Sequence, residues 1–353
     1  MNTDTKTILI KTISRLGKAS VTEVIKNLPE RRSRQWISTL LNRMANNGEL
    51  VRSKSGKFAF FVLPNRIDLI GKKVTKRLIN KDLQEDIIFD ELSRQSLFVK
   101  QVKEGVHSIL GYAFTEMLNN AIEHSSSDTI NVFFEEVNDN ISFEVLDRGI
   151  GAFRNIMQKN KLSSELEAIQ ELLKGKMTTL PHSHTGEGIF FTSKIADIFI
   201  LDSFNYRLRV DNIIHDVFVE KINPYVGTRV RFEIDKRSGK HLNDIFYEYQ
   251  AEPGSHSFDK TKVHVKLYKA GTIYISRSQA RRLIANLDKF KLIILDFEGI
   301  GTIGQAFADE VFRIFVAKHP HTAIQPTNMS ETVEFMVNRV QPQLTLLDKE
   351  KTA

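Results

Sequence analysis

The stretch EMLNNAIEHS, from Glu116 to Ser125, combines two acids, two adjacent amides and a histidine. At helical spacing Glu116, Asn120 and His124 share one flank, because residues four apart lie one turn from each other. A second flank is apolar and can pack against a core. Its residues are Phe114, Leu118, Ala121 and Ile122. The pattern predicts a helix over about 102–125 that forms the floor of a polar site.

Glycine motifs follow this helix at three places. Residues 130–137 and 141–147 alternate or run apolar around a polar turn, which predicts a hairpin ending in the sequence DRGIG at 147–151. The sequence HTGEG, at 184–188, precedes a predicted helix, and Gly227-Thr228 precedes a predicted strand. Between the first two motifs lies a charged helical insert.

These elements, in this order, resemble the ATP-binding domain of the GHKL superfamily over about residues 80–236. That superfamily includes gyrase, mismatch-repair proteins, heat-shock chaperones, histidine kinases and anti-sigma-factor serine kinases. The local sequence NNAIEHS is closest to the anti-sigma kinase branch. The resemblance implies a GHKL-type α/β sandwich over 76–236 that binds ATP and Mg²⁺.

The resemblance also implies roles for individual residues. Asp147 accepts a hydrogen bond from the amino group of adenine, and guanine, which has a carbonyl there, is excluded. Asn120 presents an oxygen to Mg²⁺, and Glu116, one turn earlier, orients or deprotonates an attacking water or hydroxyl. The other implied ATP-binding residues are Gly149, Gly151, Thr185, Gly186, Gly188 and Thr228. A structural ion pair is the alternative for Glu116, and a helix cap or surface position is the alternative for His124.

Local reasons accompany these roles. Gly149 and Gly151 are expected to allow positive φ and to leave room for the purine. Gly186 and Gly188 let backbone N–H groups turn toward phosphate at a helix start. Thr228 is expected to reach Asp147 through water. The insert, over about 155–185, is expected to be a lid that closes over phosphate.

The N-terminal region is strongly basic. Residues 1–66 hold 13 Lys and Arg against 4 Asp and Glu, whereas the whole chain has a net charge of +7. Helices are predicted at 6–17, at 21–28 with Ser20 and Glu23 as a capping box, and at 31–46, before a hairpin with a basic tip. The third helix is expected to have an apolar face of Trp36, Leu40, Leu41 and Met44.

Three helices followed by a basic hairpin resemble a winged helix-turn-helix domain over 1–66, which implies DNA binding. The alternative is a basic helical module that binds protein. Candidate base-reading and phosphate-contacting residues lie on the third helix and the hairpin. They are Arg31, Arg32, Arg34, Gln35, Arg52, Lys54 and Lys57, with Ser33 and Ser38 as further base readers.

Beyond a polar linker at 237–258, strands alternate with helices, which predicts a small α/β domain over 259–345. Its segment DFEGIGTIGQAFADEVF resembles the STAS (anti-anti-sigma) fold. Ala306 stands where phosphorylated STAS proteins carry serine, and Thr302 lies earlier in the loop. This favours a docking domain over a phosphoacceptor. Its acids Asp296, Glu298 and Asp309 could form an acidic docking face.

Composition limits the function classes. The chain has no cysteine, no apolar run of 18 residues and no secretion signal at its start, so we expect a cytoplasmic protein without a membrane span. Residues 1–66 contain no histidine, which argues against a sensor histidine kinase with its upstream phosphoacceptor.

The sequence therefore predicts a multidomain α/β protein: a winged helix, a GHKL-type α/β sandwich and a small STAS-like α/β domain. The first functional hypothesis is an ATP-binding transcription regulator whose nucleotide state controls binding of DNA or of a partner, including a second protomer. The alternative is a serine kinase that acts on a separate STAS-type partner in an anti-sigma-factor switch. An ATP-gated clamp ranks last, because the chain lacks long dimer-forming arms.

Overall fold

The computed structural model describes residues 3–30, 32–55, 58–69, 73–137, 139–175, 187–252, 254, 257–268 and 276–340. The chain divides into two compact units. The first comprises Met1–Ala152 and Ile195–Lys240, and the second comprises Phe153–Lys194 and His241–Ala353. Both units combine helices with a sheet, so the protein is a multidomain α/β protein. In the described parts of the chain, no helix is both long and apolar enough to cross a membrane.

The first unit begins with a small helical region and a three-stranded antiparallel sheet in the order β1-β3-β2. Its elements are α1 (Thr3–Leu16), β1 (Lys18–Ser20), α2 (Val21–Lys26), α3 (Arg34–Asn46), β2 (Val51–Ser55), β3 (Phe58–Val62) and the 3₁₀ helix η1 (Pro64–Leu69). The capping box at the start of α2 is confirmed: Ser20 Oγ accepts the Glu23 N–H, and Glu23 Oε2 accepts the Ser20 N–H at 2.7 Å. A core that includes Ile13, Leu41 and Phe61 joins the helices to the sheet.

The third helix differs from expectation in its start, which is Arg34 with Ser33 as N-cap instead of residue 31, and in one residue of its apolar face. The side chain of Trp36 is 43% exposed, and Ile37 is buried in its place with Leu40, Leu41 and Met44. The guanidinium of Arg32 lies 5.4 Å from the centre of the Trp36 ring. Trp36 therefore lies on the outer, basic side of α3.

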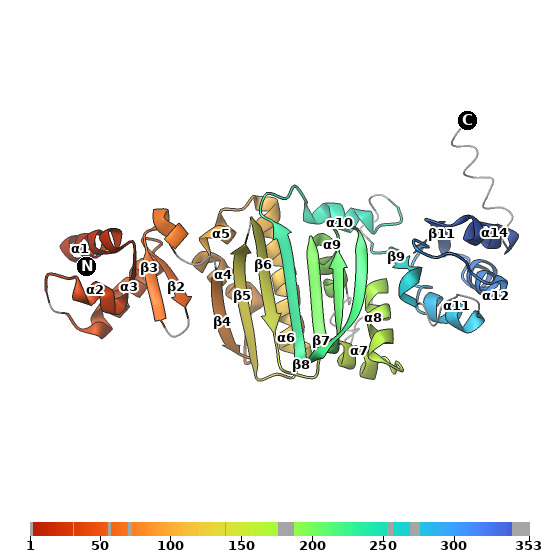
Figure 1. The fold of residues 1–353 in the computed structure, drawn as a ribbon, viewed down its shortest axis with the longest axis horizontal. Helices are drawn as coiled ribbons and strands as arrows, with labels where there is room; N and C mark the ends of the chain where they lie inside the picture. Colours follow the sequence, from red (N-terminus) through yellow and green to blue (C-terminus); the bar gives the residue numbers. More distant parts are fainter. Residues whose placement is uncertain are drawn as a thin grey trace, which may run out of the picture. The chain divides into compact units, whose positions relative to one another are not determined.

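The rest of the first unit is a five-stranded antiparallel sheet in the order β4-β5-β6-β8-β7 (Figure 1). Its elements are β4 (Lys73–Ile79), α4 (Glu85–Gln95), α5 (Leu97–Lys100), α6 (Glu104–His124), β5 (Thr129–Val137), β6 (Asn140–Leu146), β7 (Ile198–Asp211) and β8 (Asp216–Asp235). The predicted apolar flank of α6 packs on this sheet. The Phe114 ring lies 5.2 Å from Phe134 and 5.4 Å from Phe143.

The last two strands are longer than the sequence indicates. The apolar runs at 199–204, 206–210, 215–221 and 228–234 predict four separate strands, but they form only β7 and β8, which pair along almost their whole length. The pairing shifts register at Ser203, Phe204 and Tyr206, where Phe204 has a φ of 47°. This shift is a β-bulge, which leaves an extra residue unpaired, and the β7–β8 pairing resumes on its far side.

The second unit contains a three-stranded parallel sheet in the order β11-β10-β9. Its elements are α7 (Ala152–Lys159), α8 (Glu165–Lys174), α9 (Gly188–Ile195), α10 (Leu242–Glu248), β9 (Lys260–His264), η2 (Val265–Tyr268), α11 (Arg277–Ile284), β10 (Leu292–Asp296), α12 (Gln305–Ala308), η3 (Asp309–Phe315, π-helical), α13 (Val316–Lys318), β11 (Ala323–Thr327) and α14 (Glu331–Val340). The first residue of α7 and the last residue of α9 belong to the first unit. The run at 263–268, expected as one strand, turns into a 3₁₀ helix after His264. The strand expected near 272–276 falls almost wholly outside the described residues.

The insert and the predicted linker both pack inside this second unit. Phe190 of α9 lies 4.9 Å from Tyr249 and 4.8 Å from Phe258, measured between ring centres. Tyr249 and Phe258 are both buried, so the predicted linker at 237–258 contributes to the core of the unit. On α8, the buried Lys174 carbonyl accepts a 2.7 Å hydrogen bond from Thr261 Oγ1 of β9.

Candidate functional site

Asp147, directly after β6, is the centre of a polar corner in the first unit. Its side chain is only 3% exposed. Its Oδ1 accepts the N–H of Gly149 at 2.9 Å and that of Thr228 at 3.1 Å. Burial raises the pKa of the carboxyl group and outweighs these two hydrogen bonds, which lower it. The carboxylate is therefore held in a fixed orientation by backbone donors, with little solvation.

Thr228, on β8, is a direct neighbour of Asp147. The Asp147 N–H donates to the Thr228 carbonyl at 2.9 Å, and the Thr228 hydroxyl hydrogen-bonds the carboxylate. The same hydroxyl accepts the Ala152 N–H at 3.0 Å. The expectation that Thr228 reaches Asp147 through water is therefore wrong: the contact is direct.

The glycines of the corner are needed for close approach. A Cβ on Gly149 would lie 1.7 Å from the Ser125 carbonyl oxygen, and a Cβ on Gly227 would lie 2.4 Å from the Asp147 carbonyl oxygen. Gly151 has a φ of 80° and Gly227 a φ of 95°, as only glycine adopts readily. Gly149 does not have positive φ, so the expectation of positive φ is wrong at this position; the residue is required by its contact with the end of α6.

Helix α6 is joined to this corner at its C-terminus. The Ile150 N–H donates to the Ser125 carbonyl at 2.8 Å, immediately after α6 ends. One turn up the helix, Asn120 Nδ2 donates to the Glu116 carbonyl at 2.8 Å. This bond fixes the amide, and its side-chain oxygen remains as the acceptor. The structure thus carries Glu116 and Asn120 on the helix that contacts the Asp147 loop.

The acids and the histidine of α6 are half-buried or exposed. Both Glu116 and His124 are half-buried, and His124 Nε2 lies 4.0 Å from Glu123 Oε2. Across the described residues, no group of three or more His, Asp or Glu is arranged to hold a metal ion. A magnesium ion here would need ligands from bound phosphates beside Asn120.

The predicted phosphate-binding loop is described only at its end. Gly188 is the first residue of α9, and the Phe191 N–H donates to the Glu187 carbonyl at 2.9 Å as that helix begins. Thr185 and Gly186 lie outside the described residues. Gly188 belongs to the second unit and the Asp147 corner to the first.

The outer face of the sheet behind the corner carries a buried ion cluster that the sequence did not indicate. Asp202 of β7 is fully buried and accepts Arg207 Nε at 2.6 Å and Arg229 Nε at 3.0 Å. Burial alone would raise the pKa of Asp202, but the hydrogen bonds from both guanidinium groups prevail and lower it. No local motif marks this aspartate, because its partners lie 5 and 27 residues away.

The predicted DNA-contacting residues of α3 are exposed. Arg32, Arg34 and Gln35 are solvent-exposed at its start. Arg34 Nη1 donates to Thr22 Oγ1 at 3.2 Å, and Arg32 pairs with Glu30 at 2.5 Å. The expected base reader Ser33 is the N-cap of α3, with its Oγ accepting the Trp36 N–H. Arg31 and Lys57 lie outside the described residues, as does the side chain of Lys54.

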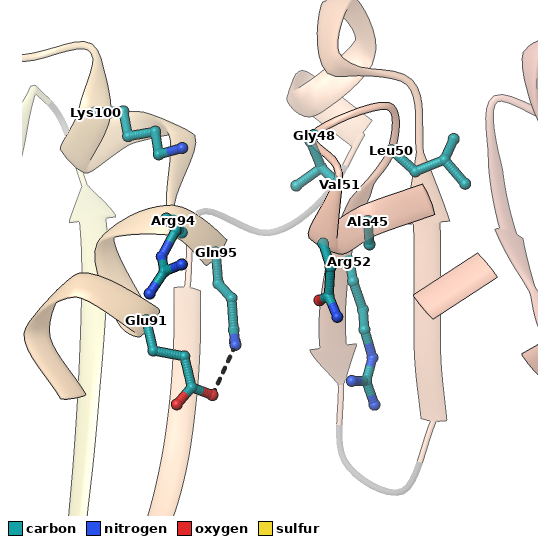
Figure 2. Close-up of a pocket in the computed structure, with 10 residues that line it drawn as sticks. Ala45, Gly48, Leu50, Val51, Arg52, Glu91, Arg94, Gln95 and Lys100 are labelled. Carbon is teal, nitrogen blue, oxygen red and sulfur yellow. Dashed lines mark hydrogen bonds between the residues drawn. The ribbon is translucent and has the colours of Figure 1, made fainter. Parts of the chain in front are cut away.

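Arg52, predicted to contact phosphate, lies at a pocket. Figure 2 shows it on β2, and the pocket wall also includes Arg94 and Lys100. The Nε of Arg52 is buried and has no hydrogen-bond partner in the described part of the chain. The dashed line in Figure 2 marks the 3.1 Å bond from Gln95 Nε2 to Glu91 Oε1.

The acidic docking face expected in the C-terminal region is wrong. The Asp296 side chain is 2% exposed and its Oδ2 lies 3.0 Å from Lys262 Nζ. Asp309 pairs with Arg277 at 3.1 Å and with Arg313. Only Glu298 of the three acids is exposed. Two of the charges are therefore neutralised within the fold.

Comparison with known families identifies one part of the chain. Residues 279–334, from α11 into α14, match the family model described as a STAS-like domain of unknown function (DUF4325). None of the curated proteins compared with the chain matches it. The matched segment contains β10 and β11 and the helices around them. The C-terminal region of the protein therefore carries a STAS-like domain.

Proposed function

We propose that the protein is an ATP-binding regulator, in which the nucleotide state of the central, GHKL-type domain controls binding of DNA or of a protein partner. The observation that carries the proposal is the Asp147 corner. A buried carboxylate is oriented there by the N–H groups of Gly149 and Thr228, at 2.9 and 3.1 Å. A buried, pre-oriented acceptor suits the exocyclic amino group of adenine and rejects a carbonyl at that position.

The first experiment measures nucleotide preference. Calorimetry with Mg²⁺ should detect ATP binding and no comparable GTP binding. Asp147→Asn should weaken ATP binding about 10- to 150-fold, because a hydrogen bond to a charged group contributes about 1.5–3 kcal/mol. Asp128→Asn, an exposed aspartate of the same unit, is the matched control and should bind normally. Equal affinity for ATP and GTP would refute the adenine assignment.

The second experiment separates two roles on α6. Glu116→Ala should abolish hydrolysis while nucleotide binding remains, because the carboxylate is proposed to act on the attacking water. Asn120→Ala should weaken metal-dependent binding itself, because its oxygen is proposed to hold Mg²⁺. Equal loss of nucleotide binding in both variants would contradict this division.

DNA is the proposed partner of the N-terminal region. The support is a net charge of +9 over residues 1–66 and the exposed basic start of α3. The helix order and the β1-β3-β2 sheet agree with a winged helix. Removing residues 1–66 should abolish DNA binding and leave ATP binding intact. Unchanged DNA affinity would remove the winged-helix assignment and leave a protein-binding module.

The second candidate function is phosphorylation of serine on a separate STAS-type partner, as the NNAIEHS resemblance implies. The STAS-like domain of this chain has Ala306 in the first turn of α12, after Gly304 as N-cap, so no serine is available at that place in cis. Radiolabel from the γ-phosphate of ATP should go to water under the first proposal. Transfer of the label to another protein would favour the kinase.

A further inference from the structure

Ser203 of β7 carries a hydroxyl group that the fold leaves unsatisfied. The residue is 0% exposed, and its Oγ has no hydrogen-bond partner within the described part of the chain. Buried polar atoms nearly always have a partner, and one without it costs about 1–3 kcal/mol. A buried, unpartnered hydroxyl therefore indicates a water or a ligand group that completes it.

The position of Ser203 connects it to the Asp147 corner. Ser203 pairs with Thr228 in the β7–β8 register, and the Thr228 N–H donates to Asp147 Oδ1. A Cβ placed on Gly151 would lie 2.6 Å from Ser203 Oγ. Asp147, directly after β6, Thr228 of β8 and Ser203 of β7 thus follow one another across three neighbouring strands.

Asp147 and Thr228 together supply an acceptor for the edge of adenine but no donor. The edge of adenine offers a donor, the amino group, and an acceptor, N1. Asp147 is an acceptor only, which suits the amino group. The Thr228 hydroxyl hydrogen-bonds the carboxylate and accepts the Ala152 N–H, so its single proton is already used. A donor for N1 must come from another residue.

We propose that Ser203 is a specificity-determining residue that donates its hydroxyl proton to N1 of a bound adenine, across one water at most. The inference rests on the proposed ATP binding and adds a second polar group to its base recognition. Ser203 contributes to base recognition and takes no part in phosphate chemistry.

The test is a cycle that pairs Ser203→Ala with 1-deaza-ATP, in which a C–H replaces N1. Calorimetry on the full chain with Mg²⁺ should show 1-deaza-ATP binding about two- to tenfold more weakly than ATP to the unsubstituted protein, since a neutral hydrogen bond contributes about 0.5–1.5 kcal/mol. Ser203→Ala should reduce the affinity for ATP by a similar factor. It should then bind both nucleotides equally, because the interaction with N1 is already absent.

Ser142→Ala is the matched control. Ser142 is also a buried hydroxyl without a partner among the described residues, but it lies on β6 opposite Glu233, five residues before Asp147. It should bind both nucleotides as the unsubstituted protein does. Without nucleotide, neither alanine variant should lower the unfolding temperature, because each removes an unsatisfied group.

Three results would overturn the inference. One is equal binding of ATP and 1-deaza-ATP by the unsubstituted protein. Another is that Ser203→Ala reduces the affinity for ATP and for 1-deaza-ATP by the same factor, which would indicate a structural role. The third is a clear drop in unfolding temperature for Ser203→Ala alone, which reveals a protein partner for the hydroxyl. Failure of the unsubstituted protein to bind either nucleotide would overturn the proposed function itself.

Discussion

Replacing Lys174 with methionine should separate α8 from the STAS-like region. Lys174 is 0% exposed, and its Nζ lies 2.6 Å from Glu171 Oε1. It also donates to the carbonyls of Arg282 and Ala285, at 3.1 and 2.8 Å, where α11 ends. Burial lowers the pKa of Lys174, and the attraction of Glu171 opposes that shift. One ammonium group therefore joins α8 to the end of α11.

The expected magnitude follows from what remains buried. Lys174→Met leaves the buried Glu171 carboxylate without its ammonium partner, and the 2.9 Å hydrogen bond that its Oε2 accepts from Asn286 Nδ2 remains. Removing one partner of a buried ion pair costs about 3–5 kcal/mol, whereas replacing both partners is often nearly neutral. The double variant Glu171→Gln/Lys174→Met should therefore cost much less than the single one.

Hydrogen exchange on the full chain measures this locally. In Lys174→Met, protection of α8 and α11 should fall together by about two to three and a half orders of magnitude, which is the fold-change for 3–5 kcal/mol. Protection of β5 and β6 should not change. Lys159→Met, an exposed lysine at the end of α7, is the control and should have no effect.

Two outcomes would refute this reasoning. If the double variant loses as much protection as Lys174→Met, the unpaired Glu171 charge is not the cause. If α8 loses protection while α11 keeps it, the ammonium does not join the two helices.

Three further predictions concern other regions. Gly149→Ala should destabilise the first unit by about 3 kcal/mol or more, because its Cβ meets the Ser125 backbone, whereas Gly239→Ala, with open space around it, should be neutral in urea unfolding. Burial lowers the pKa of His264 to about 4, so only the unfolded state takes up a proton as the pH falls from about 6.5 to 4, and up to about 3 kcal/mol of stability is lost over that window. His264→Gln should remove this slope in exchange rates measured for β10. Arg34→Ala should weaken DNA binding. An equal loss at all sequences, with the salt slope of the titration reduced by about 1, would identify a phosphate contact, and a loss confined to one base position would identify a base contact. Unchanged affinity and slope would exclude Arg34 from the interface.

Local patterns in the sequence predicted the elements that depend on neighbouring residues. Helix α6 was expected at 102–125 and spans Glu104–His124, because its apolar flank has a regular helical period. The capping residue Ser20 was correctly identified at the start of α2. Each of these features is set by residues within a few positions of each other.

Features that depend on distant partners could not be predicted in this way. Lys174 belongs to a charged helical segment and would ordinarily be exposed, but carbonyl groups more than 100 residues away bind its ammonium. The need for glycine at 149 arises from Ser125, which is distant in sequence. Trp36 has an apolar side chain but lies outside the core, because Ile37 takes the inward position.

The ion cluster behind the sheet lies next to the proposed base site in the same two strands. Strand residues alternate between faces, so Asp202 and Arg229 occupy one face while their chain neighbours Ser203 and Thr228 occupy the other. A substitution of Arg229 would leave the groups of the proposed base site chemically intact, and we expect it to shift the spacing between those two hydroxyls. If the protein binds adenine as proposed, its discrimination among purines can therefore be altered from the face of the sheet opposite the proposed base site.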